Sequence, residues 1–450
     1  MSCVAKTLRC LWTAALLCGA AHAGWAQEAN TGLRLETDAE DIDALLPPSP
    51  PPKAARITIG DDEEPVIRKR KKVVDAYAAP GLRTGAFLLY PTLEIGSIVS
   101  SNVRKSSTKA KADVGLRLKP QLRFESDWVR HSLTGTASLS AEQFIDNKDI
   151  KSRGAEMKAA LRLDIRRTTT ADFDTSYSAT SVGLESSELP ATATGSRLDQ
   201  SFGVGAGVTH DFGGLEGRLR LGVSRSLYGD VNLSGGGKED NSDRDYTQLS
   251  LSARATLKSG AIVQPFAEIA FEPRIHDKKT DRNGIRRNSR GVRVAAGISI
   301  ADDPIWTGDV AATLERRDYS DDSLETILAP GVAANLTWRP TDLTRFEFNA
   351  SASLAEAASA GVSASQNWNL GVTATHALRD NLELVGGLRS GFERSGGTTD
   401  VTTIGNFGVN WIVNPYVVLN AGYEGTFFNG AAAGSNYADQ RLLTSIILRH

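Results

Sequence analysis

Strict alternation of apolar and polar residues is the sequence feature that most constrains this fold. Residues 215–223 read LEGRLRLGV, and 248–257 read QLSLSARATL after a polar, glycine-rich run. Because successive side chains of a β-strand point to opposite faces, this period places Leu221 on one face and Arg220 on the other. The two stretches therefore predict an antiparallel hairpin with one apolar and one charged face.

The same alternation continues from about residue 83 to the C-terminus, and it predicts roughly 18 strands, an even number. Short connections are expected near Asp127, Arg167, 213–214, 259–260, 302–304, 339–341, 380–381 and 414–415. Longer polar connections are expected near 101–110, 145–152, 184–200, 230–245, 274–290, 317–323, 357–365, 394–400 and 429–438. Short turns at one end and long loops at the other are typical of outer-membrane barrels.

The N-terminal residues 1–26 are predicted to be a secretory signal peptide. Lys6 and Arg9 precede an apolar run that ends in small residues suited to cleavage. All three cysteines lie inside this segment, so the mature chain cannot use thiol chemistry or thiolate metal sites. No other stretch approaches about 18 continuous apolar residues, which excludes a helical membrane protein.

Residues 27–80 are predicted to form a disordered periplasmic tether. A proline-rich run at 47–52 and charge blocks at 61–64 and 68–72 leave too little apolar surface for independent folding. The basic block 68–72 has two interpretations: a solvated charge run, or a site for an anionic partner such as lipid headgroups.

Residues 81–450 are expected to form an all-β, transmembrane antiparallel β-barrel of about 18 strands in the outer membrane. The alternative is a soluble β-sandwich, whose apolar face would be hidden. Strands of about 12 residues exceed the usual sandwich length of about 5–6. Charged residues alternate through the strand middles, and aromatics gather near strand ends, where membrane interfaces belong. In this interpretation the apolar face contacts lipid and the charged face lines the lumen.

The segment 77–96, YAAPGLRTGAFLLYPTLEIG, followed by Asn102 and Val103, resembles the opening of a known family. It is similar to the putative outer-membrane beta-barrel porin family of the alphaproteobacterial type. A second similar block begins at 281–286, DRNGIR. The resemblance spans about 77–450 and implies an outer-membrane barrel. Some members resemble outer-membrane partners of polysaccharide export, which is an analogy of fold.

We find no enzyme motif and predict no catalytic residue, no metal site and no cofactor. The histidines are scattered without ligand spacing, and the Gly-Gly-Gly-Lys run at 235–238 lacks the pattern of a phosphate loop. The block at 281–284 resembles part of a calcium loop, but it lacks the acidic end ligands and is better explained as a turn.

The charged face carries the functional prediction. Mixed positive and negative residues indicate a weakly selective polar path. The predicted lumen-lining residues are Arg117, Lys119, Arg162, Asp164, Arg166, Arg218, Arg220, Arg254, Glu268 and Glu347.

The sequence thus predicts a channel for passive passage of polar solutes, with saccharide or exported polysaccharide as candidates. The alternative is a non-channel docking barrel in which residues 28–80 recruit a periplasmic protein. Expected contacts are outer-membrane lipid and a polar solute or saccharide, with no nucleic acid, since the formal net charge is -2.

Overall fold

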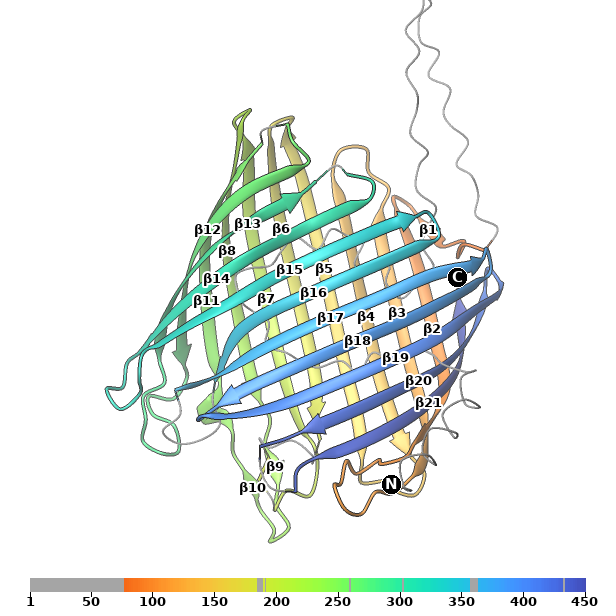
Figure 1. The fold of residues 1–450 in the computed structure, drawn as a ribbon, viewed down its shortest axis with the longest axis vertical. Helices are drawn as coiled ribbons and strands as arrows, with labels where there is room; N and C mark the ends of the chain where they lie inside the picture. Colours follow the sequence, from red (N-terminus) through yellow and green to blue (C-terminus); the bar gives the residue numbers. More distant parts are fainter. Residues whose placement is uncertain are drawn as a thin grey trace, which may run out of the picture.

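Eighteen antiparallel strands close into one barrel in the computed structural model (Figure 1). The structure describes residues 77–183, 189–190, 192–258, 260–301, 303–356, 363–431 and 434–450. The predicted signal peptide 1–26 and the predicted tether, except for its last residues 77–80, lie outside the described residues.

The barrel strands follow one another around the wall in chain order. They are β2 (Phe87–Ser100), β3 (Asp113–Ser126), β4 (Ser132–Phe144), β5 (Lys151–Arg166), β6 (Thr169–Val182), β7 (Arg197–Asp211), β8 (Leu215–Tyr228), β11 (Tyr246–Leu257), β12 (Val263–His276), β13 (Ser289–Ile300), β14 (Trp306–Tyr319), β15 (Ile327–Thr341), β16 (Thr344–Glu356), β17 (Ala364–Arg379), β18 (Leu382–Ser395), β19 (Thr398–Asn414), β20 (Val417–Asn429) and β21 (Tyr437–Arg449). Their lengths exceed those of ordinary sandwich strands, as the alternation predicts.

Pairing of the first and last strands closes the sheet. β2 pairs with β21 from Thr92–Arg449 to Ser100–Arg441, while its other edge pairs with β3. A short β1 (Leu82–Thr84) pairs with the start of β2. Closure removes the free sheet edges, which have no hydrogen-bond partners in a hydrocarbon layer.

Two smaller elements lie at the end of the barrel where the long connections gather (Figure 1). The strands β9 (Val231–Asn232) and β10 (Lys238–Glu239) form a hairpin between β8 and β11, followed by the 3-10 helix η2 (Ser242–Arg244). We call this the long-loop end and the opposite one the short-turn end.

The connection between β18 and β19 differs from the prediction. A long loop near 394–400 was expected, but β18 ends at Ser395 and β19 begins at Thr398. Gly396 and Gly397 form the turn with φ values of +55° and +85°. Two consecutive residues with positive φ suit the tight turn of a two-residue hairpin, and glycine adopts this backbone without strain.

Aromatic side chains form a stacked row on the outer face at the short-turn end of β14 to β16. The ring centroids of Trp306 and Trp338 are 5.4 Å apart, and those of Trp338 and Phe346 are 5.0 Å apart. Phe348 continues the row at 6.4 Å from Phe346. Such a row belongs at the interface between lipid and water, where one edge of each ring meets the polar headgroups.

A small apolar cluster fills the interior next to the closing seam. Ile98, Phe144 and Leu443 come from β2, β4 and β21. Val103, from the loop after β2, packs against them. Gly115 of β3 leaves room for the Phe144 ring, because a Cβ at Gly115 would lie 3.0 Å from that ring. The segment at 102–103 that resembles the porin family thus anchors a loop inside the barrel.

Candidate functional site

The charged face of the strands is the concave, inner face of the barrel. Arg254 of β11 donates a hydrogen bond of 2.7 Å to Asp309 of β14, across two intervening strands. Arg441 of β21 reaches Glu142 of β4 in the same way at 2.7 Å. Adjacent strands are about 4.8 Å apart, so side chains bridge several strands only where the sheet curves toward itself. Leu221, on the other face, is exposed.

Four buried charges form an ion-pair quartet on β12, β13 and β14. Arg293 donates to both carboxylate oxygens of Glu272 at 2.5 Å, and Arg317 donates to Glu315 at 2.9 Å. Two longer contacts close the group, from Arg293 to Glu315 at 3.8 Å and from Arg317 to Glu272 at 3.9 Å. None of the four side chains is more than 7% exposed. The quartet carries no net charge.

A glycine makes room for this quartet. Gly291 lies on β13 between Glu272 and Arg317 in register, and a Cβ there would lie 2.7 Å from the Arg317 guanidinium. The arginine therefore lies flat across the intervening strand. Glycine is required at position 291 because the Arg317 side chain lies so close to the backbone there, not because of its backbone angles.

A second group of charges spans the closing seam. Arg117 of β3 lies 3.7 Å from Glu94 of β2 and 3.7 Å from Glu142 of β4. Arg441 of β21 contacts Glu142 and also Glu424 of β20, the latter at 3.6 Å. These ion pairs connect the first strands of the chain with the last ones.

Several of the predicted lumen-lining residues come together on β8, β11 and β12. In register, Arg254 lies opposite Arg218 on one side and Glu268 on the other. Arg218 lies 3.8 Å from Asp172, and Arg220 forms an ion pair with Asp174. Each of these arginines thus has a carboxylate partner on another strand.

Other predicted residues lie apart from this group. Arg162 and Asp164 pair with each other at 3.1 Å near the short-turn end of β5, where Arg166 is also exposed. Glu347 of β16 pairs with Arg345 at 3.2 Å. Arg117 belongs to the seam group, and Lys119 is half-buried two residues further along β3.

The sequence-based set of lumen-lining residues did not include the most buried charges. They include Arg197, Glu272, Arg274, Arg317 and Glu424. Their alternation with outward apolar residues, such as Phe271 before Glu272, is the signal that identifies them. Arg274 donates to Gln248 at 2.7 Å and to the carbonyl of Leu354 on β16 at 2.8 Å, a contact that only the curvature of the barrel permits.

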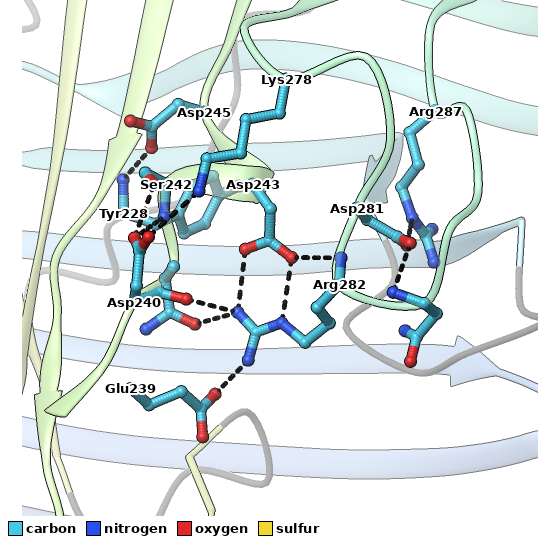
Figure 2. A network of polar contacts seen from close by, with 12 residues as sticks. Tyr228, Glu239, Asp240, Ser242, Asp243, Asp245, Lys278, Asp281, Arg282 and Arg287 are labelled. Carbon is cyan, nitrogen blue, oxygen red and sulfur yellow. Dashed lines mark hydrogen bonds and ion pairs between the residues drawn. The ribbon is translucent and has the colours of Figure 1, made fainter. Parts of the chain in front are cut away.

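At the long-loop end, Arg282 joins two loops (Figure 2). Its guanidinium donates to both oxygens of Asp243 at 2.9 Å and to Glu239 at 2.5 Å. Its Nη2 also donates to the Asn241 side chain at 2.8 Å, and Lys278 contacts Asp240 at 3.0 Å. The loop after β8 is thereby fixed to the loop after β12.

The block at 281–286 is a turn, as predicted. The Asp281 carboxylate accepts backbone N–H bonds from Asn283 and Ile285, and Arg287 donates to it at 2.8 Å. Gly284 has a φ of +79° in this turn. The hydrogen bonds of the Asp281 carboxylate are therefore made with groups of the same chain.

Further contacts extend this connection to the neighbouring loops. The Arg286 backbone N–H donates to Asp321 in the loop after β14 at 2.9 Å. On the other side, the Thr194 N–H donates to the Asn232 carbonyl at 2.9 Å, and Ala193 bridges to Leu233. Hydrogen bonds thus connect four consecutive long loops, which we call the long-loop rim.

Asp240, Asp243 and Asp321 of the rim have lowered pKa values. Hydrogen bonds from Ser242, and then from Lys278, lower the pKa of Asp240. Burial alone raises the pKa of Asp243, but the hydrogen bonds from Arg282 lower it overall. The Arg286 N–H and Ser323 lower the pKa of Asp321 to about 2. Each ionised carboxylate therefore stabilises the rim above the unfolded pKa of about 3.9.

As pH is lowered, the hydrogen bonds of the rim are expected to break while the barrel strands are still folded. The stabilisation is complete above about pH 5 and is lost as pH falls through the lowered folded pKa values, toward about pH 2. Hydrogen exchange followed by mass spectrometry, corrected for intrinsic rates, should show loss of protection in the loops at 229–245 and 277–288, while strand amides stay protected. Unchanged protection of these loops at pH 2 would contradict this prediction.

Within the described ranges, no three His, Cys, Asp or Glu residues gather as a metal ion would need. Among the same residues, no helix is long and apolar enough to cross a membrane.

Closed pairing, an apolar outer face and a charged inner face define the class of protein: an outer-membrane β-barrel. The chain belongs to the family described as Putative beta-barrel porin 2, which it matches over residues 75–450. It is therefore a porin-like outer-membrane protein, in agreement with the resemblance at 77–96. The comparison with curated proteins found no match.

Three solved structures that match this chain with low scores are receptors. A variant of the ferric enterobactin receptor PfeA from Pseudomonas aeruginosa has a TM-score of 0.39 at 8% identity, with 80% of each chain covered. The siderophore receptor PirA from Acinetobacter baumannii gives the same values. The ferripyoverdine receptor from Pseudomonas aeruginosa has a TM-score of 0.38 at 10% identity, covering 79% of this chain and 59% of its own. Scores this low support no inference about ligands.

Proposed function

We propose that the protein is a channel for the passive passage of polar solutes across the outer membrane, with saccharide or exported polysaccharide as its candidate cargo. The observation that supports this proposal is the lining of the inner face, where arginines form ion pairs with carboxylates on other strands. Such a lining suits polar solutes without strong preference for either ion sign. Barrels of about 16–18 strands are wide enough for an aqueous path.

In this proposal the predicted residues line the path, and the long-loop rim faces the cell exterior. The lining comprises Arg117, Lys119, Arg162, Asp164, Arg166, Arg218, Arg220, Arg254, Glu268 and Glu347. The exposure of Asn349, Ser351 and Arg389, three residues whose positions alternate with apolar outer-face residues, supports a water-accessible region beside β16 and β18. The proposal assigns no enzymatic activity to the chain.

Purified protein in planar lipid bilayers is expected to give discrete conductance steps. Because inner-face charges are paired, the reversal potential in a tenfold KCl gradient should lie close to zero, well short of the roughly 59 mV of ideal selectivity for a monovalent ion. Protein unfolded by heat before addition serves as the control. A folded preparation that never gives steps would rule out the channel.

A further inference from the structure

Asparagine is distributed unevenly around the barrel wall. Seven asparagines occur within β15, β16, β17, β19 and β20 on the same face: Asn335, Asn349, Asn367, Asn369, Asn406, Asn410 and Asn420. The described residues of β2 to β8, β11 to β14 and β21 include none. Asparagine is disfavoured in strands, so this concentration requires a reason beyond folding. We call these residues the carboxamide wall.

The strand register places the wall on the inner face. Asn335 lies opposite Asn349, and Asn410 lies opposite Asn420. Residues at the alternate positions of the same strands, such as Leu370 and Phe407, are among the exposed hydrophobics of the outer face. The carboxamides therefore face the interior.

Two glycines of β18 let these carboxamides lie along the wall. A Cβ at Gly387 would lie 2.5 Å from Oδ1 of Asn406, and one at Gly391 would lie 3.3 Å from Oδ1 of Asn369. Larger residues on β18 would push both side chains away from the wall. Arg389 lies between these two glycines on the same face of β18, so the surface from β16 to β19 combines carboxamides with an exposed positive charge.

The wall retains capacity for further hydrogen bonds. Asn420 donates to Asn410 at 2.7 Å. In contrast, Oδ1 of Asn367 and Nδ2 of Asn369 are covered by neighbouring atoms and have no hydrogen-bond partner among the described residues. Asn349 is exposed, whereas the ion-pair quartet on the neighbouring strands β12 to β14 is buried. The water-accessible space therefore borders the carboxamides.

The wall is also long. Asn420 lies near the short-turn end of β20, and Asn367 lies near the long-loop end of β17. At about 3.3 Å per residue, the row extends for about 30 Å along the strands. Because the strands of such barrels tilt by about 35–45°, this length spans most of the apolar band, which is about 25 Å tall.

We propose that the carboxamide wall is the surface along which a neutral, polyhydroxylated chain, an oligosaccharide, passes through the barrel. A carboxamide donates and accepts hydrogen bonds, as each sugar hydroxyl does. A neutral ligand does not compete for the partners of the ion pairs on the neighbouring strands β12 to β14. Successive weak sites allow a ligand to enter and to leave, which conduction requires. This inference rests on the proposed channel function and names its substrate class.

The test is block of the bilayer current by maltohexaose. The wild-type channel should show saturable block, and a hexamer of galacturonic acid, equally long but charged, should block less strongly. The triple variant Asn349→Ala, Asn369→Ala, Asn406→Ala should raise the half-blocking maltohexaose concentration at least about tenfold, since each lost hydrogen bond is worth roughly 0.5–1.5 kcal/mol. Its conductance in salt alone should stay within about twofold. Asn381→Ala, in the short turn before β18, should behave as wild type.

The outcomes separate the two proposals. A wild-type protein without conductance steps overturns the channel itself. Steps without maltohexaose block, or equal block of the wild-type and triple-variant channels, overturn only the carboxamide wall. Stronger block by the galacturonic acid hexamer than by maltohexaose also overturns only the carboxamide wall. If the triple variant does not fold, as judged by its heat-modifiable mobility on gels, the single variant Asn349→Ala at an exposed position must still raise the half-blocking concentration about twofold or more.

Discussion

Replacing Leu221 by arginine is expected to destabilise the barrel by about 2–4 kcal/mol. Leu221 lies at the middle of β8, opposite Leu251 of β11, and both side chains are exposed on the outer face. In a membrane this face contacts hydrocarbon, where a guanidinium loses its hydration. Equilibrium unfolding in urea from lipid vesicles measures the change in the free energy of unfolding that the substitution causes.

Arginine at an inner position provides the matched control. Ser351, near the middle of β16, is exposed on the inner face, where water can solvate a charge. Ser351→Arg is expected to change the unfolding free energy by less than about 1 kcal/mol, as for other exposed sites. Equal effects of charge at Leu221 and at Ser351 would show that the two faces have been assigned wrongly.

Replacing Arg317 by methionine is expected to cost about 3–5 kcal/mol, because it leaves buried carboxylates without their partner. The Arg317 side chain is 0% exposed and donates to Glu315 as well as to Ser289. Methionine keeps much of the side-chain volume, so the loss comes from charge rather than from a cavity. The same unfolding measurement in vesicles determines this cost.

A double-mutant cycle separates charge from packing. Glu315→Gln removes the partner charge with little change in shape, so the double variant with Arg317→Met should lose less than the sum of the two single variants. Simple additivity of the two effects would contradict an ion-pair role for the quartet. Arg316→Met is the control, because Arg316 is exposed and forms its ion pair with Asp318, two residues further along the chain.

The strands and their faces could be predicted from the sequence because a period of two is a local property. Leu221 and Arg220 are assigned to opposite faces without any knowledge of their neighbours. The turn at Gly396–Gly397 was missed, although two adjacent glycines between alternating segments are a recognisable hairpin signal. The polar residues around them suggested a longer loop.

The contacts within the site could not be predicted in this way. Alternation shows that Arg254 faces inward, but not that it reaches Asp309 across two strands. That pairing depends on register and on the curvature of the closed sheet. Arg317 likewise reaches the quartet only because Gly291 lies beside it on the neighbouring strand.

By itself, the sequence determined a closed antiparallel barrel with an apolar outer face and a polar inner face. Only the tertiary structure decided which inner residues meet, since closure brings β2 to β21 and the strand register places Asn335 opposite Asn349 and Asn410 opposite Asn420. The physical reason is that side-chain direction is set within a strand, whereas partners are set by pairing between strands.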